Sequence, residues 1–355
     1  MADPFLFLNM RTSILALFFL LLIHAGKSQT TFSFDYNGTT REYILYTPSN
    51  MPIGNRPLVF NFHGYTNNMS FQMGYSEMNA VADVGKFYVV YPQGLPDANG
   101  INHWNAWQDP ADVDDIGYIN ALLDYLLATE SVDYQRVYSC GFSNGGIFSY
   151  ALAGQLSDRF AAIASVAGTM TEVMLQNTNP TRPVPTFHIH GTLDPVVPYD
   201  GSLGQYPTFG VLTSVSETLN FWKTEDDCSS TSTNNIANSN LFDFCTASKT
   251  IYSGCAEHDN WYIEISGGGH TWPGTTPLTV TGATCQDFDG SQEIWNFFSA
   301  ITMPPMSVEE NTNGKNVVPV AYYDLQGRVI EKTELCQGIY IVRMSDGSAK
   351  KIKRE

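Results

Sequence analysis

The sequence predicts an α/β fold with a mostly parallel central sheet flanked by helices, and two patterns carry this prediction. Short apolar runs typical of buried strands alternate with longer stretches typical of helices. Before them, two segments around Asn37-Gly38 alternate apolar and polar residues, which indicates an antiparallel hairpin. Strands that alternate with helices are joined by crossovers and so lie parallel.

The predicted elements after the hairpin follow from these patterns. The strands cover residues 57–62, 87–91, 137–140, 161–166, 186–189 and 261–265. The helices cover residues 116–127, 146–155, 211–222 and 291–298. Asp114 and Asp115 stand at the predicted N-cap of the first helix, where a carboxylate can accept the unpaired N–H groups of the first turn.

Composition describes a globular chain and restricts its partners. The 355 residues include 18 Lys+Arg against 35 Asp+Glu, and 43% are apolar. We expect no nucleic-acid or anionic-membrane partner, because both repel a strongly acidic protein at long range. This excess of acidic residues is compatible with a protein that binds uncharged substrates.

The N-terminus has the layout of a secretory signal peptide. Arg11 precedes an apolar run at 14–23, and Gly26-Lys27-Ser28 offers a small-residue cleavage site. The run is too short to span a bilayer as a helix. We therefore predict a signal peptide at 1–28, a mature N-terminus at Gln29, and transit through the periplasm to the cell surface or the medium.

Export permits disulfide bonds. Four cysteines surround a Ser/Thr/Asn-rich insertion: Cys228, Cys245, Cys255 and Cys285. We expect one or two bridges among them, with the pairing left open, and their spacing fits no zinc motif. Cys140 lies within a predicted strand and is expected to be a buried free thiol.

A boundary at Met303-Pro304-Pro305 separates a main domain at 29–303 from a small β-module at 306–355. The module carries 8 basic and 7 acidic residues, unlike the acidic main domain. Its segments 323–328 and 338–342 and its lysine-rich end resemble the C-terminal sorting domains of the type IX secretion system of Bacteroidetes. It lacks their usual Pro-Asn-Pro opening. The resemblance implies an export address and the secretion machinery as a partner.

The segment Gly141-Phe142-Ser143-Asn144-Gly145 connects a predicted strand directly to a predicted helix. A Gly-x-Ser-x-Gly in this context is typical of a nucleophile elbow, a tight turn that lifts the serine hydroxyl clear of the sheet. Ser143 is therefore the candidate nucleophile.

A serine nucleophile needs a base and an acid, which follow it in the chain order Ser, Asp/Glu, His in this type of site. Asp194 follows the strand at 186–189 and is preferred to Asp200, which lies further into the loop. His270 follows the last strand and three glycines that let the backbone carry the imidazole towards the serine. The other histidines are assigned to the signal peptide, to packing or to loops: His24, His63, His103, His188, His190 and His258.

An oxyanion hole requires two backbone donors near the nucleophile. The N–H of Asn144, directly after the serine, is the first. The loop after the strand at 57–62 supplies the second, and the bend at Gly64 makes Tyr65 N–H the candidate, with His63 bracing the loop.

Together these motifs resemble the secreted polyhydroxybutyrate depolymerase-like and feruloyl esterase-like hydrolases of the first carbohydrate esterase family. The matching residues are His63-Gly64, Tyr91-Pro92-Gln93-Gly94, Trp104, Trp107, Asp114-Asp115, Gly141 to Gly146, Gly191-Thr192-Leu193-Asp194, Val197-Pro198-Tyr199 and Gly269-His270-Thr271-Trp272-Pro273-Gly274.

The resemblance spans about residues 30–300 and implies an α/β-hydrolase fold, a serine esterase and no cofactor. It implies hydroxycinnamoyl or acetyl esters of polysaccharides as substrates, or polyhydroxyalkanoate-type polyesters and their oligomers. Near the motifs, Trp104, Trp107 and Trp272 are candidates for stacking on an acyl group or sugar ring.

Two alternatives stay open at the level of sequence. An acyltransferase on the same fold would pass through the same acyl-enzyme and replace water with an alcohol acceptor. A non-catalytic surface binding protein could keep the hydrolase scaffold, although the complete set of Ser143, Asp194 and His270 argues against it.

Overall fold

The computed structural model describes residues 28–106, 113–204, 210–277, 281–304, 319–323, 329–331, 338–344 and 349–354. The strands of its main sheet are β1 Ser28–Tyr36, β2 Thr39–Thr47, β3 Arg56–Phe62, β4 Tyr88–Pro92, β5 Val132–Phe142, β6 Ala162–Val166, β7 Thr186–Gly191, β8 Ser230–Asn235, β9 Thr246–Ser253 and β10 Asn260–Ser266. The helices are α1 Met69–Ser76, α2 Met78–Gly85, α3 Asp115–Thr129, α4 Asn144–Gln155, α5 Glu172–Asn177, α6 Val215–Glu225 and α7 Gly290–Ser299.

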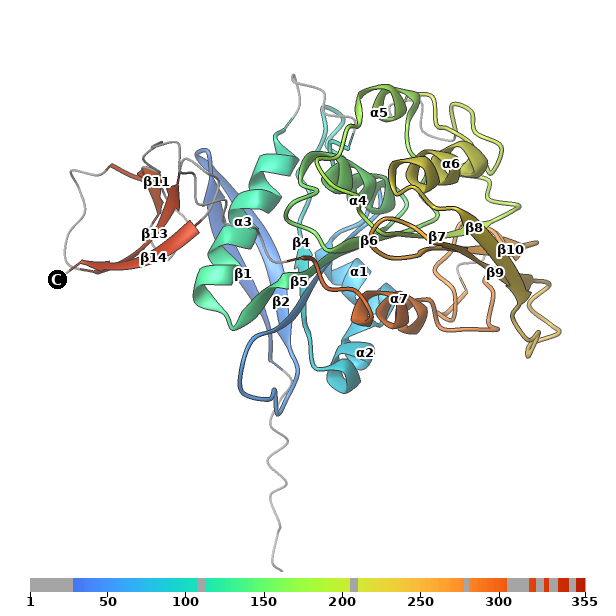
Figure 1. Ribbon diagram of the computed structural model, residues 1–355, viewed down its shortest axis with the longest axis horizontal. Helices are drawn as coiled ribbons and strands as arrows, with labels where there is room; N and C mark the ends of the chain where they lie inside the picture. Colours follow the sequence, from blue (N-terminus) through green and yellow to red (C-terminus); the bar gives the residue numbers. More distant parts are fainter. Residues whose placement is uncertain are drawn as a thin grey trace, which may run out of the picture.

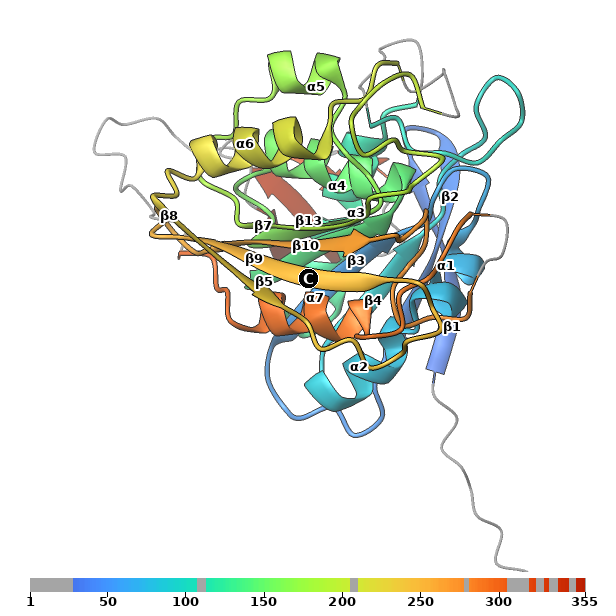
Figure 2. The same cartoon turned by 90° about the vertical axis from the view of Figure 1, so that its right-hand side faces the viewer.

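The main sheet has ten strands in the order β1-β2-β4-β3-β5-β6-β7-β10-β9-β8. The six central strands, from β4 to β10 in this order, are parallel to one another. At each end of the sheet two further strands follow, β2 and β1 on one side and β9 and β8 on the other, and each pairs antiparallel with its inner neighbour. Helices cover both faces, with α4, α5 and α6 on one and α1, α2 and α7 on the other (Figures 1 and 2). The predicted α/β fold with a mostly parallel sheet is confirmed.

The predicted N-terminal hairpin is also confirmed. β1 pairs with β2 from Ser28↔Thr47 to Tyr36↔Thr39. Asn37 and Gly38 between them both have positive φ, 49° and 77°. This is the backbone that two-residue hairpin turns require, and it explains the Asn-Gly pair.

Each face of the sheet buries its own apolar layer. Phe60 and Phe62 pack with α4 through Phe148 on one face. Tyr138 on the opposite face stacks on Phe298 of α7 at a ring-centroid distance of 4.7 Å. Cys140 is a fully buried free thiol in this second layer, as expected. The strands are apolar on both faces because both are covered.

The start of α3 is fastened to the N-terminal half of the sheet. Asp114 is its N-cap, as predicted, and accepts from the N–H of Gly117 at 2.9 Å. Asp115 forms a buried ion pair with Arg41 of β2 at 2.6 Å and also accepts from the N–H of Asn105. One carboxylate thus holds together a helix, a strand and the loop before the helix.

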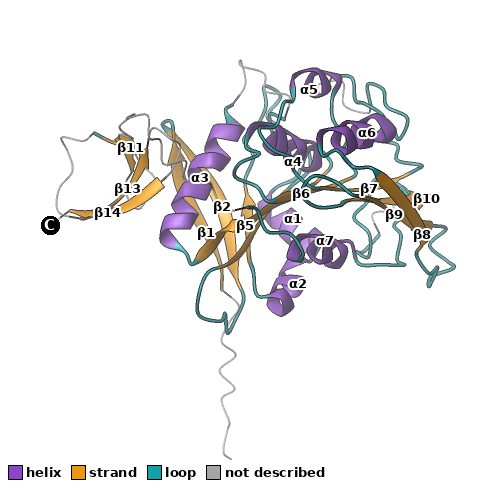
Figure 3. Cartoon of the chain, viewed as in Figure 1, coloured by secondary structure: helices purple, strands orange, loops and turns teal. Residues whose placement is uncertain are grey.

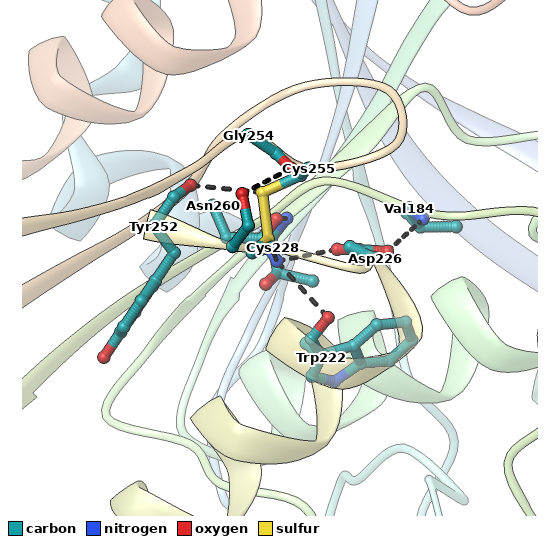
Figure 4. The surroundings of a disulfide bond; sticks show 10 residues. Val184, Trp222, Asp226, Cys228, Tyr252, Gly254, Cys255 and Asn260 are labelled. Atoms are coloured by element: carbon teal, nitrogen blue, oxygen red, sulfur yellow. Dashed lines mark hydrogen bonds between the residues drawn. A yellow bond between two sulfur atoms is a disulfide. The ribbon is translucent and has the colours of Figure 1, made fainter. Parts of the chain in front are cut away.

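A disulfide bond joins Cys228 to Cys255 at the base of the β8–β9 hairpin (Figure 4). It is one of the bridges expected among the four cysteines. Beside it, Asp226 is buried and accepts from the N–H of Val184 at 3.0 Å and from Asn260 Nδ2 at 2.7 Å. Burial raises the pKa of Asp226 to about 7, although these hydrogen bonds oppose the rise.

Near the C-terminus a second sheet contains β11 Pro319–Tyr323, β12 Val329–Ile330, β13 Gly338–Met344 and β14 Ala349–Arg354. Its order is β12-β11-β13-β14, all pairs are antiparallel, and it lies beside α3 (Figures 1 and 3). Residues 1–27 of the predicted signal peptide, most of the 323–328 motif and Trp107 lie outside the described residues. Among the helices that are described, none is long and apolar enough to cross a membrane.

The pKa of Asp226 predicts a pH-dependent stability. Its folded value lies above the value of an exposed aspartate, so the folded chain holds a proton that the unfolded chain releases above about pH 4. The free energy of unfolding should therefore fall, on the order of a few kcal/mol, as the pH rises from 4 to above 7. Urea unfolding of the wild type and of Asp226→Asn at several pH values measures this. Parallel pH profiles for the two proteins would contradict the assignment.

Candidate active site

Ser143 occupies a sharp turn between β5 and α4. Its φ of 55° and ψ of −120° are strained for a residue with a side chain. The backbone holds this geometry through two hydrogen bonds, from Ser143 N–H to the carbonyl of Val166 at 2.8 Å and from Ile147 N–H to the carbonyl of Ser143 at 2.9 Å. The turn is the predicted elbow in conformation as well as in position.

The glycines on either side of the elbow allow the chain to approach itself closely. A Cβ on Gly141 would lie 2.4 Å from the carbonyl carbon of Gly145. A Cβ on Gly145 would lie 2.4 Å from the carbonyl oxygen of Phe62, at the end of β3. No side chain fits at either position, so both glycines are required by packing.

Asp194 and His270 meet across the loops that follow two neighbouring parallel strands, β7 and β10. Asp194 Oδ2 lies 2.7 Å from His270 Nδ1, and the N–H groups of Val196 and Val197 both donate to Asp194 Oδ1 at 2.8 Å. Asp200, the other candidate, is exposed. Burial alone would raise the pKa of Asp194, but the charge and hydrogen bond of His270 outweigh it and hold that pKa below its usual value.

The imidazole of His270 packs on Phe142, the residue before Ser143. Its ring centroid lies 4.7 Å from that of Phe142. The backbone of this loop is fixed by Thr281 and Ala283, whose carbonyls accept from the N–H groups of His270 and Gly269 at 2.7 and 2.9 Å. Ser143, Asp194 and His270 therefore gather at the carboxyl edge of the sheet, which is where open α/β sheets place their ligands.

The loop after β3 lies against Ser143. A Cβ on Gly64 would lie 3.3 Å from Ser143 Cβ, so the bend before Tyr65 borders the elbow. Asn144 is the first residue of α4, whose first-turn N–H groups have no partner within the helix. This arrangement suits the two donors predicted for an oxyanion hole.

His63 braces that loop. Gly94 N–H donates to its Nε2 at 2.9 Å, so the proton is on Nδ1, which donates to the carbonyl of Gly64 at 2.8 Å. Burial lowers the pKa of His63 to about 4, which keeps the ring neutral near pH 7. The imidazole of His63 holds the bend at Gly64, and both of its nitrogens are used in these hydrogen bonds, so neither can act in catalysis.

The expectation that Trp104 and Trp272 form a stacking platform is wrong for both residues. Each side chain is 0% exposed. The indole of Trp104 donates to the carbonyl of His63 at 3.0 Å, and that of Trp272 donates to Ser291 Oγ at 3.1 Å. They hold the loops of the site in place and have no free ring face.

His188 and His190, expected from the sequence to serve packing, form a hydrogen-bonded series that ends beside Asp194. His190 Nε2 lies 3.0 Å from the carbonyl of Val197 and 3.4 Å from Asp194 Oδ2. His190 Nδ1 lies 3.1 Å from His188 Nε2, and His188 Nδ1 lies 2.8 Å from the hydroxyl of Tyr150.

The acceptors in this series of hydrogen bonds determine which ring nitrogen of each histidine carries the proton. Because the carbonyl of Val197 only accepts, His190 Nε2 carries its proton, and His190 Nδ1 must accept from His188. His188 Nδ1 then accepts from Tyr150. Burial lowers the pKa of both histidines, so both stay neutral. Each donor thus acts on the next group along the series, and the last N–H, on His190 Nε2, also lies beside Asp194 Oδ2 at 3.4 Å, where its dipole can stabilise the buried anion.

Comparison with known proteins agrees with this geometry. The Phospholipase/Carboxylesterase family model matches residues 58–233. The putative esterase NocK of Nocardia uniformis is 30% identical over 70% of this chain and 76% of its own length. The chain belongs to the carboxylesterase family of α/β-hydrolases.

Two further comparisons place this α/β-hydrolase among its relatives. A bifunctional acetylxylan esterase/xylanase of Neocallimastix patriciarum is 28% identical over 79% of the chain, which spans only 36% of that longer protein. The solved acetyl xylan esterase of Aspergillus awamori superposes with a TM-score of 0.51 at 16% identity, over 76% of this chain and 99% of that one, and it shows the α/β-hydrolase fold.

Because Gly145 lies so close to the end of β3, adding a single methyl group there should strongly reduce esterase activity. In Gly145→Ala the new Cβ would push the end of β3 and its loop away from Ser143. We expect hydrolysis of 4-nitrophenyl acetate to fall roughly 100-fold or more, as when an oxyanion donor is lost. Gly74→Ala in α1 is the matched control, because nothing lies within 4 Å of its Cβ. Equal activity in the two variants would contradict this packing role.

Replacing His190 should lower kcat by a smaller factor, and a variant that keeps a hydrogen-bond donor should restore it. His190→Phe removes the N–H directed at Val197 and Asp194, and we expect kcat to fall roughly 10–100-fold with little change in KM, the range seen when supporting hydrogen bonds behind metal-bound histidines are lost. His190→Gln keeps a donor near the same place and should recover most of kcat. Equal losses in both variants would show that only ring packing matters.

Proposed function

We propose that the chain is an exported serine carboxylic ester hydrolase that works through an acyl-enzyme. The observation that carries the proposal is the 2.7 Å contact between Asp194 Oδ2 and His270 Nδ1. The ring of the same histidine packs on Phe142, directly beside Ser143 in the elbow. A buried carboxylate held to one imidazole nitrogen leaves the other nitrogen free to act as a base.

In the proposed mechanism Ser143 Oγ attacks the ester carbonyl while His270 Nε2 removes its proton. Asp194 keeps the proton of His270 on Nδ1 and stabilises the imidazolium. The N–H groups of Tyr65 and Asn144 bind the oxyanion, and each donor contributes about 3–4 kcal/mol to the transition state. The alcohol leaves with the proton from His270, and water repeats the sequence to release the acid.

The substrate class is proposed from the resemblance and the relatives. Two proteins that the chain resembles are named for acetylxylan esters. We propose hydroxycinnamoyl or acetyl esters of polysaccharides, or polyhydroxyalkanoate-type polyesters and their oligomers, as substrates. The net charge of −17 favours such neutral polymers over anionic ones.

Three features of the chain together support the proposal that it is exported. The N-terminal segment has a signal-peptide layout, the C-terminal sheet belongs to a segment that resembles a sorting domain, and the Cys228–Cys255 bond suits an oxidising compartment. In this proposal residues 1–28 are removed, 29–303 form the hydrolase domain and 306–355 address the secretion machinery.

Ser143→Ala tests the mechanism. We expect kcat on 4-nitrophenyl acetate to fall by about 10⁶, because the acyl-enzyme can no longer form. Ser33→Ala, an exposed serine of β1, is the control and should keep full activity. Thermal unfolding of both variants checks that the fold is intact. Substantial turnover by folded Ser143→Ala would reject the assignment.

A substrate panel tests the class of ester. Methyl ferulate, acetylated xylan, hydroxybutyrate oligomers and an aromatic polyester would be compared by kcat/KM, each with Ser143→Ala as blank. We expect at least one of the first three to be cleaved more efficiently than 4-nitrophenyl acetate. Product diverted to an added alcohol or sugar in preference to water would instead identify an acyltransferase.

A further inference from the structure

Two free cysteines lie together beside the loop that carries His270. Cys245, just before β9, and Cys285, before α7, are 3% and 0% exposed and belong to the same apolar layer. Cys245 N–H and the N–H of Gln286, next to Cys285, both donate to the carboxylate of Asp243, which brings the two cysteines together. The interaction between the two thiols lowers the pKa of Cys245 and raises that of Cys285. The two sulfur atoms therefore face each other within one buried cluster.

The backbones on both sides are already fastened. Asp243 Oδ1 accepts from the N–H of Cys245 at 2.9 Å, and its Oδ2 accepts from the N–H of Gln286 at 2.7 Å. Asp287 Oδ1 accepts from the N–H groups of Ser239 and Asn240 at 2.7 and 3.1 Å. Two carboxylates thus hold the segments of Cys245 and Cys285 in register, so the thiols can join without a large backbone movement.

A metal ion is the competing explanation for this cluster. Asp243, Cys285 and Asp287 each offer one ligand atom, and these atoms lie within 4.8 Å of one another. However, both carboxylates are oriented by backbone N–H donors, and this accounts for their positions without a cation. The thiols also act as donors, Cys245 Sγ to the carbonyl of Asp243 at 3.4 Å and Cys285 Sγ to Asp287 Oδ2 at 3.8 Å, whereas a metal is bound by the deprotonated thiolate.

We propose that Cys245 and Cys285 form a second disulfide bond, which clamps the loop of the catalytic histidine. The two thiols lose two protons and two electrons as the sulfur–sulfur bond forms. The electrons reduce a small disulfide such as oxidised glutathione, whose own bond breaks to give two thiols. With Cys228–Cys255, the four cysteines of the insertion are then paired 228–255 and 245–285.

The bond would hold both sides of the His270 loop. On one side, the carbonyl of Cys285 accepts from the N–H of Gly274 at 2.8 Å. On the other, Gly267 lies so close to Phe244 that a Cβ there would be 2.5 Å from the carbonyl oxygen of Phe244. The cross-link closes a loop of about 40 residues that contains His270, and a loop of this length gives a large entropic stabilisation.

Peptide mapping of the full chain tests the pairing directly. The protein is exported into an oxidising compartment, denatured in iodoacetamide without reductant, digested and analysed by mass spectrometry. We expect a Cys245–Cys285 peptide besides the Cys228–Cys255 peptide, with Cys140 alkylated. Alkylated Cys245 and Cys285 in a sample whose Cys228–Cys255 bond has formed would overturn the proposal. Stoichiometric zinc with both thiols reduced would overturn it in favour of a metal site.

The double variant Cys245→Ser/Cys285→Ser tests the clamp. We expect Tm to fall by roughly 5–10 °C and kcat on 4-nitrophenyl acetate to fall several-fold with KM little changed. Cys228→Ser/Cys255→Ser is the matched control, because it opens a hairpin base on another part of the sheet and should lower Tm with little effect on kcat. Equal kcat losses in both variants would overturn the clamp.

The expected kcat effect rests on the proposed role of His270, whereas the peptide map and the Tm do not. A linked 245–285 peptide in a chain without esterase activity would therefore reject the proposed function and leave the disulfide standing.

Discussion

The site depends on how closely the main chain packs around Ser143. Glycines remove the side chains that would keep three neighbouring segments apart, at Gly141, Gly145 and Gly168, where added Cβ atoms would lie 2.4 Å from backbone atoms. This packing imposes the strained φ of Ser143, which the hydrogen bond to Val166 helps to maintain. The same contacts bring the loop after β3 beside the serine, so the proposed nucleophile and the proposed oxyanion donors are arranged by one constraint.

The proposed acid and base, Asp194 and His270, depend on a balance between burial and hydrogen bonding. Asp194 is 6% exposed and would be costly to ionise without partners. The N–H groups of Val196 and Val197, the imidazole of His270 and the aligned chain behind His190 supply these partners. A carboxylate stabilised in this way can hold one tautomer of His270 and stabilise the imidazolium ion, as the proposed mechanism requires.

Local patterns predicted the fold because its elements are encoded by residues close in sequence. The Asn37-Gly38 turn, the Asp114 cap and the glycine-flanked Ser143 each depend on backbone geometry within a few residues. The predicted chain order also selected Asp194 and His270, which the structure brings together. Since strand order confines such residues to one edge of a parallel sheet, order along the chain carries spatial information.

The errors concern features that depend on contacts between distant segments. Trp104 and Trp272 stand next to site motifs, but whether an indole faces solvent is decided by partners such as His63 and Ser291. β8 has no apolar alternation, and all its residues are exposed. It forms because its backbone pairs with β9, and the Ser/Thr/Asn-rich composition of this insertion gave no strand prediction here.

The alignment of His188 and His190 with Asp194 required the register of β7, because residues two apart on a strand share one face. A signal existed in the sequence, since two histidines alternate just before the Gly-x-x-Asp segment. Their direction towards the carboxylate needed the carbonyl of Val197, which is seven residues from His190 and comes close only in the folded turn.

Covalent labelling tests the central claim, that Ser143 is activated by His270 and Asp194, most directly. The folded chain would be treated with a fluorophosphonate, and intact mass and peptide mapping would locate the adduct. We expect one phosphonyl group per chain, bonded to Ser143 Oγ, with labelling greatly slowed in His270→Ala. An unlabelled Ser143 in a protein that still hydrolyses esters, or equally fast labelling without His270, would contradict it.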